Sequence, residues 1–183
     1  MLFRDIHIQR VFSATWAGFD LSLLFNGVGM QHWYPGSNTS LFWGPYSRPF
    51  QTYIPGDFIP KIWTEDNPDA YFPRPRGYVA FAGGGGPREL SSVNTRYLQN
   101  VGYFRLKNLT FGYSLPEKLL KKAKIERIRV YFSGENLFTA SPLKSKYIDP
   151  AMAGATTTWK SGNTDCYGYP TARAYSFGLD ITF

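Results

Sequence analysis

The sequence is poor in charged residues and contains no long apolar run. Of its 183 residues, only 18% are charged, against roughly 25% in typical globular domains. A transmembrane helix is excluded because it needs about 18 or more consecutive apolar residues, but a membrane can also be crossed by β-strands. The first residues, 1–5, lack the charged and apolar regions of a signal peptide. We therefore expect a mature, cloned or truncated form of an exported protein, and favour truncation.

Residues for catalysis or metal binding are also scarce. The single cysteine, Cys166, cannot form an intrachain disulfide, and no neighbouring His or acid would activate it as a nucleophile. His7 and His32 are too isolated for a metal site or a catalytic triad. The glycines at 83–86 lack the following Lys-Ser/Thr of a phosphate loop, and the acids of the 57–69 stretch lack calcium-loop spacing. We predict no enzyme activity, no cofactor and no metal site.

Positive charge is in excess, but its distribution does not suggest a nucleic-acid partner. The formal net charge is +7, and the basic residues gather in the 118–129 stretch without an aromatic platform on which bases could stack. Residues 115–124 are expected to form a short turn, with Leu119, Leu120 and Ala123 on its apolar side. The lysines of this turn are either simply solvated or contact anionic lipid head groups.

Aromatic residues, at 18%, and period-two alternation are what the sequence has in abundance. The clearest case is the 175–183 segment, where two sets of residues point to opposite faces of a strand. The apolar set is Tyr175, Phe177, Leu179, Ile181 and Phe183. The polar set is Ser176, Gly178, Asp180 and Thr182. In a barrel wall the first face would meet lipid and the second the lumen, although a soluble sandwich would alternate in the same way.

Four further segments are predicted to be strands, which makes about five in all. Residues 9–16 and 19–26 form a hairpin whose tight turn is Ala17-Gly18. Residues 103–114 are predicted to form a single strand, with a change of parity near Lys107-Asn108 that a β-bulge would absorb. Residues 128–138 alternate as well, and Arg129 on the inner face avoids the roughly 2–4 kcal/mol that a lipid-facing Arg costs.

Two long stretches without periodicity separate these strands, at residues 30–100 and 141–170. Loops of this length are rare inside compact soluble domains. If Phe183 ends at the periplasm, both long loops fall outside the cell and both short connections fall in the periplasm, as in outer-membrane barrels. The sequence thus predicts an all-β fold in which antiparallel strands form part of a transmembrane β-barrel, with long extracellular loops and short periplasmic turns.

Several motifs in order resemble the C-terminal region of SusC/RagA-type TonB-linked outer-membrane receptors. The stretch Tyr-Phe-Arg-Leu-Lys-Asn-Leu-Thr-Phe-Gly-Tyr-Ser-Leu-Pro at 103–116 is one, and Arg-Val-Tyr-Phe-Ser-Gly-Glu-Asn-Leu-Phe-Thr at 129–139 is another. The other matching segments are 18–22, 43–45, 63–70, 147–150 and 169–183. The resemblance spans nearly the whole chain, and its ordered motifs make it specific.

The resemblance implies the C-terminal segment of a barrel of about 22 strands with an N-terminal plug, from a Bacteroidetes-type Gram-negative outer membrane. Such receptors import glycans or peptides, with a SusD-like surface lipoprotein and the TonB complex as partners. The plug, TonB-box and signal peptide are not among these residues. The alternative is a secreted soluble β-sandwich that binds carbohydrate through its aromatic residues, and a glycoside hydrolase is a distant third because no acid pair is supported.

Aromatic residues of the long loops are the candidate contacts for substrate or a partner, because exposed rings stack on sugars and anchor interfaces. The alternative is that they pack the loop against itself or join the interfacial aromatic girdle. The candidates are Trp33, Tyr34, Trp43, Tyr46, Tyr53, Trp63 and Tyr71. At the end of the chain, Phe183 is a candidate assembly signal, by analogy with the terminal aromatic of outer-membrane barrels.

Overall fold

A computed structural model describes residues 6–36, 39–47, 54–76, 90, 92–121, 125–155 and 171–183. The chain divides into two compact units. The sheet unit comprises Met1–Gln31, Gly102–Pro142 and Thr171–Phe183, and the loop unit comprises His32–Val101 and Leu143–Pro170. The predicted hairpin and the three further predicted strands all lie in the sheet unit.

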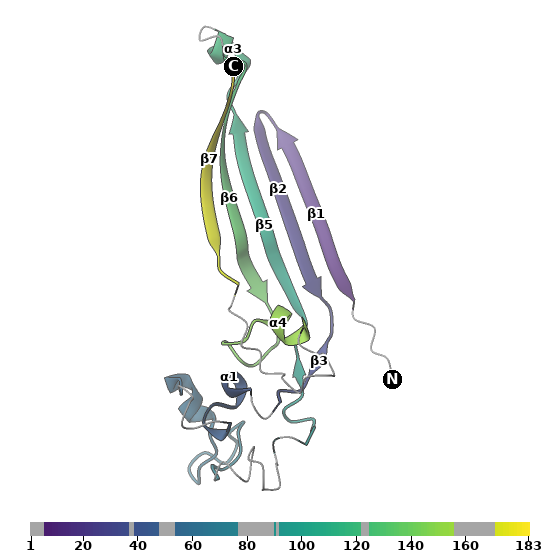
Figure 1. The fold of residues 1–183 in the computed structure, drawn as a ribbon, viewed down its shortest axis with the longest axis vertical. Coiled ribbons are helices and arrows are strands. Elements are labelled where there is room, and N and C mark those ends of the chain that lie inside the picture. The colour runs from purple at the N-terminus through teal and green to yellow at the C-terminus, as the bar shows by residue number, and fades with distance from the viewer. Residues whose placement is uncertain are drawn as a thin grey trace. The chain divides into compact units, whose positions relative to one another are not determined.

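The sheet unit is one five-stranded antiparallel sheet, with its strands side by side in the order β1-β2-β5-β6-β7 (Figure 1). The bounds are β1 His7–Trp16, β2 Phe19–Val28, β5 Tyr103–Ser114, β6 Arg127–Ala140 and β7 Ala174–Thr182. All five strands were predicted, and β5 has the predicted bounds. Because every strand alternates, the register decides which residues share a face of the sheet.

The register assembles one continuous apolar face across the sheet. Phe132 lies opposite Phe111 of β5 on one side and Phe177 of β7 on the other, and Leu109 lies opposite Leu23 of β2. This face is exposed: Phe177 is 83% accessible and Trp16 80%. The predicted apolar residues of the last strand, Tyr175, Phe177, Leu179 and Ile181, therefore share an exposed face, as expected.

The predicted turn and bulge are both present. Ala17 and Gly18 join β1 to β2 with φ angles of 50° and 88°, the left-handed pair that a tight two-residue hairpin requires. The register shifts between Leu24 and Phe25 against β5, and between Leu106 and Asn108 against β6. Lys107 is thus left out of both ladders, which confirms the bulge inferred from the change of parity.

The loop unit contains short elements that periodicity did not predict. They are β3 His32–Trp33 paired with β4 Gln99–Asn100, α1 Ser40–Trp43, and the 3-10 helices η1 Gly44–Tyr46 and η2 Gly56–Lys61, together with α4 Pro150–Ala155. Their side chains share one core, which is largely aromatic: Trp33, Phe42, Trp43, Tyr46, Phe58, Phe72, Leu90, Tyr97, Val101, Ile148 and Ala153. Segments that the sequence left as irregular loops therefore pack together around these rings.

The predicted helical turn after β5 is the short helix α3, Glu117–Leu120. Leu120 is buried, but Leu119 is 67% exposed, so these two residues do not share one buried side. Ala123 and two of the lysines of this turn lie outside the described residues. Among the helices described, none is long and apolar enough to cross a membrane.

Candidate functional site

Three of the candidate contact residues are buried in the core of the loop unit. Trp33, Trp43 and Tyr46 are each exposed by 2% or less. Trp43 packs edge-on against Phe42 and donates a 2.9 Å hydrogen bond from Nε1 to the carbonyl oxygen of Gly36. The Tyr46 hydroxyl donates to the carbonyl oxygen of Pro73 at 2.6 Å, and burial raises the pKa of Tyr46 to about 12. Such burial favours the packing alternative for these three residues.

Three other candidates are partly exposed to solvent. Tyr34, Trp63 and Tyr71 are half-buried. The Tyr34 hydroxyl donates to backbone carbonyls of residues 90 and 92, and burial raises its pKa to about 12. The Arg74 guanidinium lies 5.8 Å from the Trp63 ring centre. Contact with substrate or a partner remains a prediction for all six, and Tyr53 lies outside the described residues.

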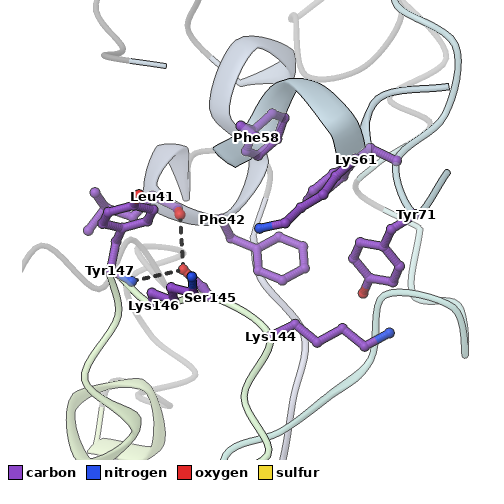
Figure 2. Close-up of a pocket in the computed structure, with 10 residues that line it drawn as sticks. Leu41, Phe42, Phe58, Lys61, Tyr71, Lys144, Ser145, Lys146 and Tyr147 are labelled. Atoms are coloured by element: carbon purple, nitrogen blue, oxygen red, sulfur yellow. Dashed lines mark hydrogen bonds between the residues drawn. The ribbon is translucent and has the colours of Figure 1, made fainter. Parts of the chain in front are cut away.

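A pocket of about 300 Å³ opens beside this core (Figure 2). Its floor is made by the buried rings of Phe42, Phe58 and Phe72. The remaining described lining residues are Leu41, Lys61, Tyr71, Lys144, Ser145, Lys146 and Tyr147. The Phe42 ring lies between Lys61, Lys144 and Tyr71 in Figure 2. The pocket is therefore apolar at its base and bears ammonium groups at its rim.

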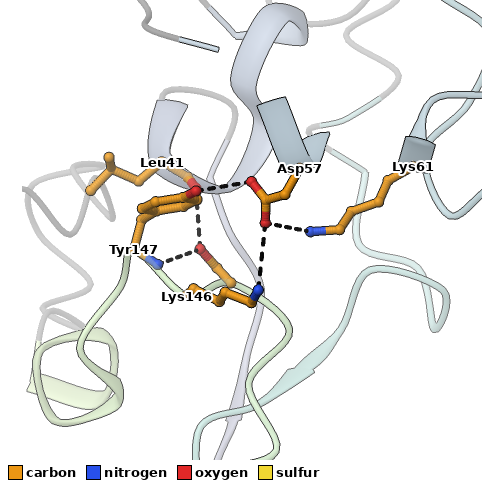
Figure 3. Close-up of polar contacts among 6 residues, drawn as sticks. Leu41, Asp57, Lys61, Lys146 and Tyr147 are labelled. Atoms are coloured by element: carbon orange, nitrogen blue, oxygen red, sulfur yellow. Dashed lines mark hydrogen bonds and ion pairs between the residues drawn. The ribbon is translucent and has the colours of Figure 1, made fainter. Parts of the chain in front are cut away.

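Polar contacts hold the 144–147 segment against α1 and η2 (Figure 3). The Tyr147 hydroxyl donates to Asp57 Oδ1 at 2.9 Å, and the Ser145 hydroxyl donates to the carbonyl oxygen of Leu41 at 3.2 Å. Asp57 Oδ2 lies 3.4 Å from Lys61 Nζ and 3.8 Å from Lys146 Nζ. The hydrogen bond from Tyr147, and then the two lysines, hold the pKa of Asp57 below its usual value of 3.8.

The third lysine of the pocket, Lys144, contacts an aromatic ring instead of a carboxylate. Lys144 Nζ lies 4.0 Å from the centre of the Tyr71 ring, a cation–π contact. The Tyr71 hydroxyl donates to the carbonyl oxygen of Arg96 at 3.1 Å and accepts from Gln99 Nε2 at 2.9 Å. Lys144 and Lys146 were not singled out in the sequence, because they follow β6 in an irregular segment and no local pattern marks them.

The polar face of the sheet has its own charged cluster. Arg129 of β6 reaches across β5 to Asp20 of β2, with Nε–Oδ1 and Nη2–Oδ2 distances of 2.9 and 2.6 Å. Its Nη1 also lies 3.2 Å from Asp180 of β7. Arg129 was expected on the inner face, and the structure places it on the polar face. In the described parts of the chain, no three metal-ligating side chains come together.

Comparison with known proteins identifies relatives of one kind. No protein-family model matches the chain. TonB-dependent receptor P3 of Formosa agariphila is 34% identical over 127 residues, which are 67% of this chain and 11% of the relative. TonB-dependent receptor P26 of the same organism is 22% identical over 174 residues, 91% of this chain and 16% of the relative. The chain thus spans a small part of the length of these curated relatives.

Solved structures share the fold. The RagAB peptide transporter superposes with a TM-score of 0.54 at 23% identity, over 93% of this chain and 16% of that chain. The RagAB peptide importer in its closed-closed state gives a TM-score of 0.52 at 23% identity, over 97% of this chain and 17% of that chain. The chain belongs to the TonB-dependent receptors.

Proposed function

We propose that this chain forms the C-terminal part of the barrel wall of an outer-membrane importer for glycans or peptides. The observation that carries the proposal is the five-stranded antiparallel sheet with one exposed apolar face and one polar face, in a chain related to TonB-dependent receptors. In a barrel wall the apolar face meets lipid and the polar face meets the lumen.

The charged cluster supports this orientation of the sheet. Arg129, Asp20 and Asp180 all lie on the polar face, where they pair across four strands. Facing the lumen, they avoid the roughly 2–4 kcal/mol that a lipid-exposed Arg or Lys costs near the bilayer midplane. The edges of the sheet, β1 and β7, would pair with the remaining strands of the barrel, because unpaired strand edges are unfavourable in lipid.

The loops then fall on the extracellular side and the short turns in the periplasm. The proposed extracellular loops are residues 30–100 and 141–170, and the proposed periplasmic connections are Ala17-Gly18 and residues 115–124. A SusD-like surface lipoprotein is the proposed partner outside the cell, and the TonB complex the proposed partner of the whole receptor. The occurrence of the curated relatives in Formosa agariphila supports a Bacteroidetes-type outer membrane.

The alternative, a secreted carbohydrate-binding sandwich, requires the apolar face of the sheet to be buried. In a sandwich Phe177, Leu179 and Ile181 would be core residues. They are 83%, 58% and 44% exposed, which favours the barrel. No enzyme activity is proposed, because the curated relatives are receptors.

Membrane fractionation of cells that express the full-length receptor tests the proposal. We expect the receptor in the outer-membrane fraction, soluble only in detergent, and we expect its deletion to abolish growth on one class of oligosaccharide or peptide. Restoration of growth by the intact gene is the control. A receptor that is secreted and soluble without detergent would favour the sandwich instead.

A further inference from the structure

The pocket of the loop unit has a preformed apolar floor. Phe42, Phe58 and Phe72 are 3%, 7% and 4% exposed. Their ring centres lie 4.5 Å apart for Phe58–Phe72 and 5.7 Å apart for Phe42–Phe72. Because these rings are packed by one another and by the core behind them, the floor can receive an apolar group without rearrangement.

The rim of the pocket is cationic. Lys61, Lys144 and Lys146 line it, and its described lining contains no acidic side chain. Asp57, just outside the lining, pairs with Lys61 and Lys146. One carboxylate against three ammonium groups leaves a net positive charge at the rim, and Lys146, whose side chain is 78% exposed, can turn towards an incoming anion.

The polar groups of the lining are already engaged within the protein. The Ser145 hydroxyl donates to Leu41 and accepts from the backbone N–H of Tyr147. The Tyr71 hydroxyl both donates and accepts, and the Tyr147 hydroxyl donates to Asp57. A sugar ring would bring several hydroxyl groups to a phenylalanine floor that cannot bond them, and unsatisfied buried hydroxyls are unfavourable.

We propose that this pocket binds the C-terminal residue of a peptide, with an apolar side chain on the phenylalanine floor and the α-carboxylate at Lys144 and Lys146. A pocket of about 300 Å³ is large enough to hold one such side chain. The inference rests on the proposed import function and narrows its substrate class to peptides with a free, apolar C-terminal residue. Residues of η2 and of the 144–147 segment would together bind the C-terminal residue of the peptide.

Binding of matched peptides to the full-length receptor in detergent tests the inference. The probes are acetyl-Ala-Ala-Phe with a free carboxylate, the same peptide as its C-terminal amide, and a short oligogalacturonate, measured by isothermal titration calorimetry. We expect the free acid to bind about fivefold or more tightly than the amide, as expected for ion pairs at a partly exposed site. Replacing Phe by Gly in the peptide should weaken binding further.

The double variant Lys144→Gln with Lys146→Gln should remove most of the preference for the free acid. Its matched control is Lys118→Gln with Lys121→Gln, which removes the same charge from exposed positions of the α3 region and should keep the preference. Melting temperatures of both variants show whether the loop unit remains folded. If the lysine variant does not fold, the affinities of the unaltered receptor for the acid and the amide still test whether binding requires the free α-carboxylate.

Equal affinity for acid and amide would overturn the inference. So would lysine-dependent binding of the oligogalacturonate without binding of the peptide, which would assign the pocket to acidic sugars. A receptor that fractionates with the outer membrane and supports growth on a nutrient but binds neither probe would overturn the pocket assignment and leave the proposed function intact. Failure of fractionation would overturn the proposed function itself.

Discussion

At the scale of single residues, Gly112 shows how the polar face accommodates its ion pair. A Cβ at Gly112 would lie 2.5 Å from Asp20 Oδ1 and 2.7 Å from Arg129 Nε. The Asp20–Arg129 pair can cross β5 only because this residue has no side chain. We expect Gly112→Ala to lower the free energy of unfolding by about 1–3 kcal/mol, as overpacking does. Thermal unfolding of the full-length receptor in detergent measures the effect.

Gly56→Ala is the matched control for this prediction. A Cβ at Gly56 would meet nothing within 4 Å. The free energy of unfolding of this variant should therefore lie within about 0.5 kcal/mol of that of the parent. If both alanine variants unfold like the parent, the close approach at Gly112 does not constrain the sheet.

Tyr46 should make the loop unit less stable at alkaline pH. Burial raises its pKa from 10.0 to about 12. Because the folded-state pKa is the higher one, its contribution to stability is complete below pH 10 and is lost as the pH rises towards 12. Tyr46→Phe should lower the free energy of unfolding by about 1–2 kcal/mol at neutral pH, because the hydrogen bond to Pro73 is lost. Above pH 10 the free energy of unfolding of this variant should fall less steeply than that of the parent. Unfolding followed by tryptophan fluorescence across this range provides the measurement.

Tyr34, Tyr71 and Tyr97 also have raised pKa values because of burial, so Tyr46→Phe should remove only part of the alkaline decline. Tyr175→Phe, at a tyrosine of β7 that is 59% exposed, is the control and should follow the parent. An unaltered decline in Tyr46→Phe would argue against the burial of this hydroxyl.

Phe183 remains the candidate assembly signal. Its side chain is 82% exposed at the end of β7. We expect Phe183→Ala in the full-length receptor to reduce outer-membrane abundance strongly at unchanged synthesis, with recovery when periplasmic proteases are removed. Normal insertion with only a lower melting temperature would identify Phe183 as an ordinary girdle residue, whose loss costs roughly 1.5–3 kcal/mol of apolar burial.

At the scale of the strand, β7 allows a comparison of the two faces at adjacent positions. Phe177 lies on the apolar face beside Phe132, with ring centres 5.1 Å apart, and Ser176 lies on the polar face. We expect Phe177→Lys to destabilise the full-length receptor by about 2–4 kcal/mol, the cost of a lipid-facing Lys. Ser176→Lys should be tolerated, because its ammonium group would meet the lumen. Unfolding in lipid vesicles compares the two.

Equal decreases in the free energy of unfolding in both lysine variants would contradict the assignment of the two faces.

The alternation of apolar and polar residues also explains why the strands could be predicted from the sequence. The parity of β5 changes at Lys107, and the register shifts at that residue, so even the bulge left a local signal. α1 and the 3-10 helices of the loop unit left none, since each has six residues or fewer and is held by ring packing instead of by its own periodicity.

At the scale of the whole molecule, the open sheet determines how these 183 residues should behave by themselves. In the described chain, β1 and β7 each have one paired side, and the apolar face is exposed. We expect the isolated chain to aggregate or to require detergent, because unpaired edges and exposed apolar surface promote association. Size-exclusion chromatography with light scattering tests this, and a detergent-free monomer with cooperative thermal unfolding would contradict it.

The sequence by itself determined the strands, their two faces, the hairpin turn and the family resemblance. These features depend on neighbours along the chain: alternation has a period of two, and the turn needs only Ala17-Gly18. It also identified the aromatic residues of the long loops, but it left open whether they touch a ligand or pack together.

Only the tertiary structure decided that Trp33, Trp43 and Tyr46 form a core with residues far away in the chain. It also brought Lys144 and Lys146 to the same pocket as Lys61, and Asp20 to Arg129 across 109 positions. Contacts between distant segments depend on register and on how loops pack, and neither leaves a periodic pattern in the sequence.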